Sequence, residues 1–358
     1  MLYWLNLLQT EFSGFNVFRY ITFRSVGAAV TAFIIMYLCG PRFIALMRRL
    51  KFGQMVRDDG PASHLAKQGV PTMGGLLMLA AVLASTLLWA RLDNMLVWLV
   101  LGITLFYGLI GGIDDYHKIS KKNSKGLSPR GKLVLQIAGA AAVAFYLFCG
   151  SQYSSHLSLP FFKNWHPDLG WFYLVFVVLV IVGASNAVNL TDGLDGLAVG
   201  PSMITTAVYV VFAYLAGHMG LSKYLDIPYI AGSGELAIFC AALFGSCLGF
   251  LWFNAYPAQI FMGDVGSLAL GGAIGSVAII IKQEFLLAIV GGVFVMEALS
   301  VIMQVGYFKA THGKRIFLMA PFHHHFEKQG WHEQKVVVRF WIVSVVLGII
   351  AIATLKLR

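Results

Sequence analysis

The chain has 358 residues, of which 58% are hydrophobic and only 12% charged, and its mean hydropathy is +0.76. A water-soluble globule needs a largely polar surface, so this composition excludes one and indicates an integral membrane protein. The formal net charge of +10 would suit a nucleic-acid partner, but the basic residues sort by loop, which favours a membrane topology and no nucleic acid.

About 20 apolar residues cross the hydrocarbon core of a bilayer as an α-helix. Runs of this kind follow one another along the chain, and no clear polar linker separates them. We therefore predict an all-α polytopic membrane protein with about ten transmembrane helices in a single domain, residues 1–358. The ten runs are 19–45, 73–90, 95–113, 132–149, 171–188, 197–216, 235–255, 265–281, 285–306 and 337–355.

The distribution of Lys and Arg predicts the orientation of these spans. Most of the 26 basic residues lie in the regions 42–67, 118–132 and 309–339. Basic loops face the cytoplasm, so an even number of spans places both termini outside. The outer segments 151–170 and 217–234 then connect spans, the first compatible with a small hairpin. Residues 1–10 lack a basic start and favour a short interfacial helix over a cleavable signal.

The carboxylates at helix ends cluster on the same predicted cytoplasmic face. Asp114 and Asp115 end the third run, where two adjacent like charges repel and are stabilised by a cation or a proton. A solvated pair beside Lys118 is the alternative interpretation. Carboxylates and phosphate oxygens are ligands for Mg²⁺, and lysines balance phosphate charge. The pattern predicts an active site for an anionic substrate bound with a metal.

Two further segments add polar groups to this face. Asn186, Asn189 and Asp192 are three residues apart and would share a helical face that Asp195 extends. Such a row can bind a nucleobase edge and ribose hydroxyls, although a turn with Asx caps is the alternative. In the segment 254–267, Asp264 precedes a span and could simply cap it. Phe261 in this segment could equally stack on a base, which is typically worth about 1–3 kcal/mol, or pack within the protein.

Histidines follow the ninth run. His323, His324 and His325 are consecutive and point in different directions, so a zinc site is a weak interpretation. Imidazoles that donate to phosphate or relay a proton fit better, with a solvated loop as the alternative. Glu297 and Gln304 share a helical face that must turn away from lipid; Gln304 is a candidate substrate contact, and Glu297 a structural hydrogen-bond partner.

Five motifs together resemble the MraY family of phospho-MurNAc-pentapeptide translocases, within the polyprenyl-phosphate hexosamine-1-phosphate transferases. The resemblance covers nearly the whole chain, and the histidine triplet is more specific to this branch than the aspartate motifs. Val70 departs from the Thr that the family often has. The motifs are GVPTMGG (69–75), Asp114-Asp115, NLTDGLDG (189–196), FMGD (261–264) and PFHHHF (321–326).

The resemblance implies transfer of phospho-MurNAc-pentapeptide from its UDP carrier to undecaprenyl phosphate in the bacterial inner membrane, giving lipid I and UMP. It implies a homodimer and Mg²⁺ on Asp264, with Asp114, Asp115 and His323 at the reacting groups. Uracil recognition is assigned to Asn189, Asp192, Asp195 and Phe261. The other expected substrate contacts are Lys67, Thr72, Lys125, Lys132, Asn186, Asn254, Gln304, His324 and His325.

The sequence is compatible with more than one reaction mechanism and more than one nucleotide-sugar donor. The lipid phosphate could displace UMP directly, with Asp114 positioning or deprotonating it, or an aspartate could first form a phosphoryl-enzyme. We favour the direct route. A related transferase would use UDP-GlcNAc, and a transporter would bury its charges at mid-membrane rather than at one interface.

Overall fold

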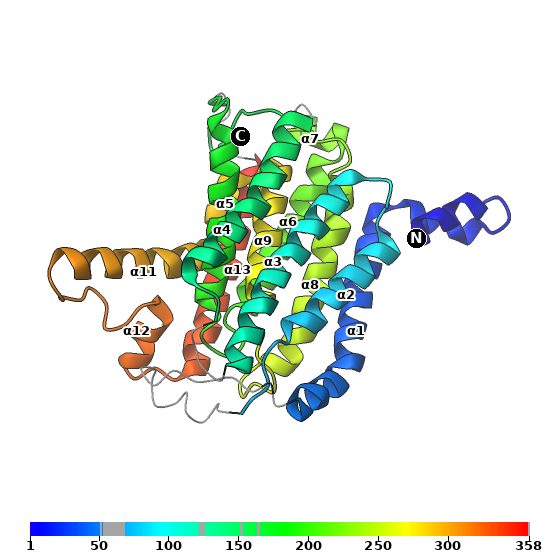
Figure 1. Ribbon diagram of the computed structural model, residues 1–358. Helices are drawn as coiled ribbons and strands as arrows, with labels where there is room; N and C mark the ends of the chain where they lie inside the picture. Colours follow the sequence, from blue (N-terminus) through cyan, green and yellow to red (C-terminus); the bar gives the residue numbers. More distant parts are fainter. Residues whose placement is uncertain (51, 53–68, 122–125, 151–152, 163–164, 357–358) are drawn as a thin grey trace.

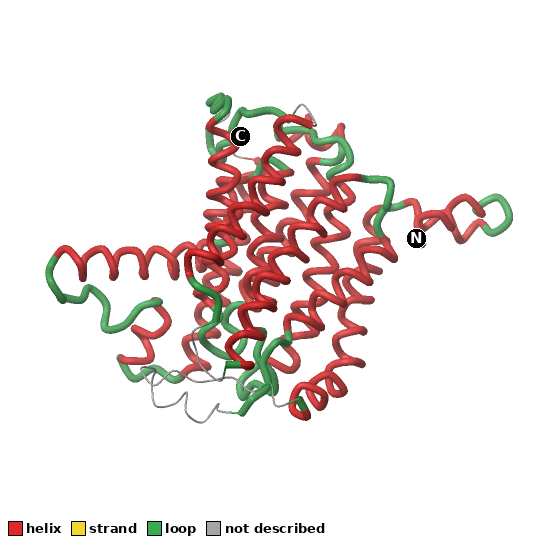
Figure 2. The backbone as a smooth tube through the Cα atoms, viewed as in Figure 1, coloured by secondary structure: helices red, strands yellow, loops and turns green. Residues whose placement is uncertain are grey.

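The computed structural model describes residues 1–50, 52, 69–121, 126–150, 153–162 and 165–356, and these residues form helices without a named strand (Figure 2). Lys67 and Lys125 lie outside the described residues. In chain order the α-helices are α1 (Ile21–Arg49), α2 (Gly75–Trp89), α3 (Met95–Ser120), α4 (Pro129–Phe145), α5 (Phe172–Thr191), α6 (Val199–Ala216), α7 (Met219–Leu225), α8 (Gly234–Asn254), α9 (Gly263–Ile280), α10 (Glu284–Val290), α11 (Gly292–Ala310), α12 (Phe322–Lys328) and α13 (Glu333–Ala353).

The prediction of a polytopic all-α membrane protein is confirmed. Within the described ranges nine helices are long and apolar enough to cross a bilayer, and α2 is an additional apolar helix of 15 residues. Their positions follow nine of the ten predicted runs closely. The chain is a multi-pass membrane protein, and the orientation of its termini stays a prediction.

Helices α8 and α9 form the centre of the bundle, with α1, α3, α5 and α6 packed around them (Figure 1). Small residues permit this arrangement, because helices in a membrane associate by close backbone approach rather than by hydrophobic exclusion from water. A Cβ on Gly271 of α9 would lie 2.5 Å from the Ala184 carbonyl oxygen of α5, and one on Gly245 of α8 would lie 2.0 Å from the Ala29 carbonyl oxygen of α1.

The prediction of one continuous span over residues 285–306 is wrong. The chain forms two helices instead, α10 and α11, which meet at Gly291 and Gly292. Glycine has low helix propensity, and two in succession allow a sharp change of direction that the apolar pattern alone does not reveal. As a result α11 leaves the bundle sideways, and α12 lies below it in the view (Figure 1).

A buried ion pair joins the first turns of α1 and α8 at one end of the bundle. Arg24 of α1 and Glu235 of α8 form two hydrogen bonds of 2.7 Å each, and both residues are buried. The backbone N–H of Arg91 also donates to Glu235 at 2.9 Å. The ring of Tyr3 lies 4.9 Å from the Arg24 guanidinium. These contacts tie the amino-terminal segment and the α2–α3 connection to the same carboxylate.

The connection between α4 and α5 and the amino-terminal segment have the local structure that their composition suggests. An antiparallel bridge pairs His156 with Asp168, as expected for a small hairpin. Residues Leu2–Leu8 and Ser13–Arg19 form two short 3₁₀ helices that project away from the bundle beside α1 (Figure 1). Trp4 of the first helix and Phe12, which precedes the second, are exposed and suit a membrane interface, where the sequence predicts residues 1–10 to lie.

Candidate active site

Two glycine-containing motifs that are far apart in sequence are joined by backbone hydrogen bonds. The N–H of Phe261 donates to the Pro71 carbonyl at 2.8 Å, and the N–H of Gly74 donates to the Phe261 carbonyl at 2.9 Å. Gly263 follows with φ of +73°, a left-handed conformation that glycine adopts without strain. The pairing places Thr72, which is buried, beside the start of α9.

The three carboxylates predicted to react or bind metal come together where α3 meets α9. Asp114 and Asp115 are buried at the end of α3, and Asp115 accepts a hydrogen bond of 3.1 Å from the N–H of Val265, so it caps α9. A Cβ on Gly111 would lie 2.1 Å from the Asp264 carbonyl oxygen. Ligand atoms of Asp114, Asp115 and Asp264 all lie within 4.8 Å of one another.

Two lysines neutralise much of this negative charge. The Lys118 ammonium lies 2.6 Å from Asp114, 3.0 Å from Asp264 and 3.6 Å from Asp115. Lys132, at the start of α4, lies 2.7 Å from Asp264. Sequence reasoning treated Lys118 only as a partner of a solvated pair. Its spacing of three and four residues from the two aspartates is the signal that places all three on one helical face.

The chemistry of these donors fits a hard divalent cation. Three carboxylates supply only oxygen ligands, as Mg²⁺ prefers, and the contacts of Lys118 and Lys132 with Asp264 show that this carboxylate is accessible to a cationic group. Burial within the bundle strengthens such electrostatic interactions relative to water. The cluster can therefore hold a metal or, with its ammonium groups, phosphate oxygens.

The asparagines of α5 extend the cluster along that helix. The Asn189 amide donates to Asp264 Oδ1 at 2.9 Å and to Ser267 Oγ at 2.8 Å. The Asn186 amide donates to Gln136 Oε1 at 2.8 Å. Gln136 was not singled out from the sequence, although its position four residues after Lys132 places both on one face of α4. The structure thus brings Asn189 to the carboxylates.

The predicted polar row does not continue as a helix, because α5 ends at Thr191. Asp192 therefore starts a turn instead of extending the face of Asn186 and Asn189. Burial, followed by the nearby carboxylates of Asp264 and Asp115, raises the pKa of Asp192 to about 8. An acid in this environment is neutral at pH 7 and can donate a hydrogen bond.

Asp195 and Asn254 hold two loops together. Asp195 Oδ2 accepts from the N–H of Ala258 at 2.9 Å. Asn254 Oδ1 accepts from the N–H of Gly196 at 3.0 Å, and its amide donates to the Ile260 carbonyl at 2.9 Å. Both side chains are buried. Sequence reasoning assigned them to substrate, whereas these contacts give them internal partners that shape the site.

Each of the three histidines has a different partner. His323 Nδ1 lies 3.1 Å from Glu297 Oε2, and His324 Nδ1 lies 2.6 Å from Glu327 Oε2. His325 Nδ1 accepts from the N–H of Leu318 at 3.1 Å. Nearby, Gln304 Oε1 accepts from the N–H of Phe317 at 2.8 Å. The triplet therefore joins α12 to α11 and to the loop between them.

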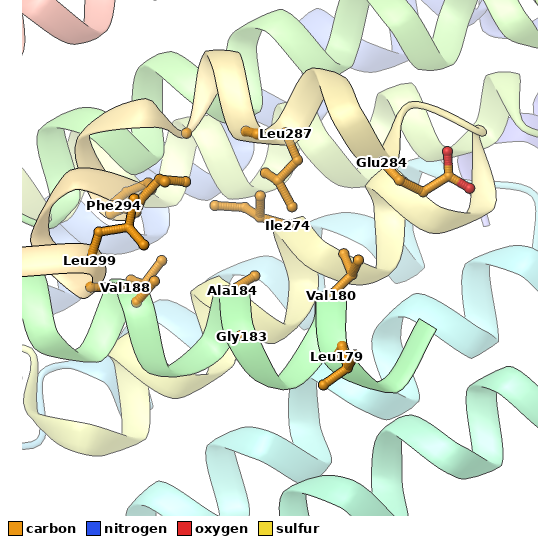
Figure 3. Close-up of a pocket in the computed structure, with 15 residues that line it drawn as sticks. Leu179, Val180, Gly183, Ala184, Val188, Ile274, Glu284, Leu287, Phe294 and Leu299 are labelled. Carbon is orange, nitrogen blue, oxygen red and sulfur yellow. The ribbon is translucent and has the colours of Figure 1, made fainter. Parts of the chain in front are cut away.

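An apolar groove of about 270 Å³ lies between α5, α9, α10 and α11. Its walls are almost entirely aliphatic or aromatic, with the carboxylate of Glu284 at one end (Figure 3). Val188 lines the groove, and the next residue in α5 is Asn189, which contacts Asp264. The groove therefore runs along the helix that leads to the carboxylates. Other lining residues are Leu179, Ile274, Leu287, Phe294 and Leu299.

Comparison with known proteins gives consistent matches. Residues 97–282 match the model of glycosyl transferase family 4. A phospho-N-acetylmuramoyl-pentapeptide-transferase of Desulfotalea psychrophila is 72% identical over 351 residues, which cover 98% of each chain. Proteins of the same name are 58% identical in Syntrophus aciditrophicus, with 98% of each chain covered, and 58% identical in Pelobacter propionicus, with 96% covered.

Proposed function

The chain belongs to the phospho-N-acetylmuramoyl-pentapeptide-transferase family, bacterial membrane enzymes of peptidoglycan precursor synthesis, and we propose how its carboxylate–lysine cluster performs the transfer. In this proposal UDP-MurNAc-pentapeptide donates phospho-MurNAc-pentapeptide to undecaprenyl phosphate, giving lipid I and UMP at the cytoplasmic face. The observation that carries it is the meeting of Asp114, Asp115 and Asp264 with two lysines at helix ends. Such an arrangement suits a diphosphate and a metal.

Mg²⁺ is the cation we assign to this cluster, with Asp264 as its main ligand and Asp114 and Asp115 beside it. When bound, the ion supplies charge neutralisation for the diphosphate and the departing UMP. With a cation bound to these carboxylates, their ammonium partners would be free to contact another anion. Lys118 and Lys132 are then positioned for phosphate oxygens, with Lys67 and Lys125 as further candidates.

The nucleotide is proposed to bind between the Asp192 turn and the paired motifs. A neutral Asp192 can donate to a uracil oxygen, and Phe261 is partly exposed beside Thr72, where it can stack on the base. Asn189 is placed to orient Asp264 as well as substrate. His324 and His325 are assigned to the sugar or phosphate end of the donor.

The polyprenyl chain is proposed to lie in the apolar groove. Its aliphatic lining matches an isoprenoid, and its position along α5 leads the lipid phosphate to Asp264 through Val188 and Asn189. The soluble donor and the embedded acceptor then approach the cluster from different directions. We further propose that the enzyme acts as a homodimer, as the resemblance implies.

Direct displacement is the mechanism we favour. Asp114 is the group that positions or deprotonates the attacking lipid phosphate, and the P–O bond to UMP breaks as the new P–O bond forms. Enzyme incubated with the UDP donor but without lipid should release no UMP. A burst of UMP equal to the amount of enzyme would instead indicate a phosphoryl-enzyme.

Release of UMP by purified enzyme tests the proposal. We expect turnover with UDP-MurNAc-pentapeptide and undecaprenyl phosphate, none with UDP-GlcNAc, loss in EDTA and recovery on addition of Mg²⁺. Asp264→Asn should stay inactive when Mg²⁺ is restored, because a metal ligand is gone. Turnover with UDP-GlcNAc would favour the related transferase, and full activity in EDTA would contradict the metal assignment. Donor transport into vesicles without UMP would favour a transporter.

A further inference from the structure

Glu297 makes contacts that its position in an apolar helix does not explain. Both Glu297 and His323 have no exposed surface. Glu297 Oε2 accepts from the N–H of Phe322 at 2.8 Å, and Oε1 accepts from the N–H of His323 at 3.1 Å. The same carboxylate thus binds two first-turn amides of α12 and also the imidazole Nδ1 at 3.1 Å. Three contacts on one buried carboxylate hold the ring in one orientation.

The other ring nitrogen has a different environment. Among the described residues, His323 Nε2 has no hydrogen-bond partner, although it is buried. A buried polar atom without a partner costs about 1–3 kcal/mol, so its persistence calls for a reason. The ring nitrogen faces the turn after α5, because a Cβ on Gly193 would lie 2.3 Å from Nε2. Gly193 directly follows Asp192, the proposed nucleotide contact.

We propose that Glu297 is a positioning residue that fixes His323 with Nε2 directed at the Asp192–Gly193 turn, where a hydroxyl group of the bound donor donates a hydrogen bond to it. Since carboxylate oxygens only accept, Nδ1 carries the proton and Nε2 keeps a lone pair that can accept a hydrogen bond. Glu297 selects this state. The absence of a side chain on Gly193 leaves room for the contact. This inference rests on the proposed function.

The substitution Glu297→Gln separates orientation from packing, because it keeps the side-chain size. An NH₂ group at the Oε2 position would face the Phe322 N–H, and one at the Oε1 position would face the His323 N–H, so in either orientation one backbone amide loses its acceptor and the imidazole is no longer held in place. We expect kcat for UMP release to fall about 10–100-fold, as when a carboxylate that orients a functional imidazole is removed. Ser300→Ala is the matched control: Ser300 is also buried on α11, and within the part of the chain that the structure describes its hydroxyl bonds only to the Glu297 carbonyl, so kcat should stay within about 2-fold.

A double-mutant cycle distinguishes positioning from a structural role. His323→Asn keeps an amide near the Nδ1 position and removes Nε2. If Glu297 acts through Nε2, adding Glu297→Gln to His323→Asn should change kcat by less than about 2-fold. Losses that multiply would overturn the inference, as would a single Glu297→Gln variant with wild-type kcat. A wild-type enzyme that releases no UMP would refute the proposed function instead.

Gly193→Ala approaches the same contact from the other side and keeps the test valid if Glu297→Gln fails to fold. Its methyl group would lie 2.3 Å from Nε2 and must displace the ring or the turn. We expect the same loss of kcat, and no further loss in combination with His323→Asn. Wild-type activity of Gly193→Ala would contradict a role for Nε2 at this turn.

Discussion

Replacing Gly111 by Ala tests whether close approach of α3 and α9 assembles the active site. The new Cβ would lie 2.1 Å from the Asp264 carbonyl oxygen, 2.4 Å from its carbonyl carbon and 2.5 Å from the Val265 nitrogen. All three atoms belong to backbone, so no side chain can move aside. The helices must separate by about 1 Å before the closest contact reaches 3.0 Å, below which real Cβ contacts are essentially never seen.

That separation moves Asp114 and Asp115 away from Asp264. A displacement of about 1 Å in a catalytic arrangement can lower activity about 100-fold, and overpacking typically lowers stability by about 1–3 kcal/mol. We therefore expect Gly111→Ala to release UMP about 100-fold more slowly and to melt at a lower temperature. UMP release and thermal unfolding in detergent measure the two effects.

Gly112→Ala is the matched control. It introduces the same methyl group one residue away in α3, where the nearest atom, Val265 Cγ2, is at an ordinary 3.7 Å. Both variants gain the same helix propensity, about 1 kcal/mol, so their difference isolates the clash. Gly111→Ala activity within about 3-fold of Gly112→Ala would refute the argument that this contact positions the carboxylates.

Two further predictions concern buried charges. The pKa of Asp192 is raised to about 8, so the stability that its neutral form allows is fully present below the unfolded pKa near 4 and is lost as pH rises through 8. Asp192→Asn should therefore raise the melting temperature more at pH 8.5 than at pH 5.5. An equal effect at both pH values would contradict the raised pKa. Glu235→Gln should destabilise the protein by about 3–5 kcal/mol by leaving Arg24 buried without its counter-charge. Asp93→Asn, at an exposed pair with Arg91, should cost about 1 kcal/mol or less, and equal losses would contradict this account.

Composition and the length of the apolar runs were sufficient to predict most of the fold, because each membrane span must satisfy its own backbone hydrogen bonds. They could not predict the break between α10 and α11. Gly291 and Gly292 leave an apolar run uninterrupted, and only the packing of neighbouring helices decides whether such a pair bends. Hydropathy indicates whether a residue prefers the membrane interior or water, but it does not predict in which direction a helix axis runs.

The candidate site was predictable by residue type and less so by role. Asp114 and Asp264 were expected at one interface, and the structure brings them together. Asp195 and Lys118 show what was missed. A polar side chain that binds substrate and one that supports a loop have the same appearance in one sequence, so the hydrogen bond from Ala258 to Asp195 could not be foreseen. The position of Lys118 among three carboxylates likewise depends on how α9 packs against α3.

Lys118 also has a consequence for the order in which ligands assemble. Its ammonium is an internal counter-ion, so the carboxylates have a partner before any metal enters. A free divalent ion must compete with that tethered charge. An ion that arrives together with a diphosphate brings a new anionic partner for the Lys118 ammonium. The ammonium then exchanges its carboxylate partners for phosphate oxygens and is not left without a counter-charge. In the proposed function, metal affinity is therefore coupled to the presence of the nucleotide, and the two lysines leave the three carboxylates with one uncompensated negative charge before the metal binds.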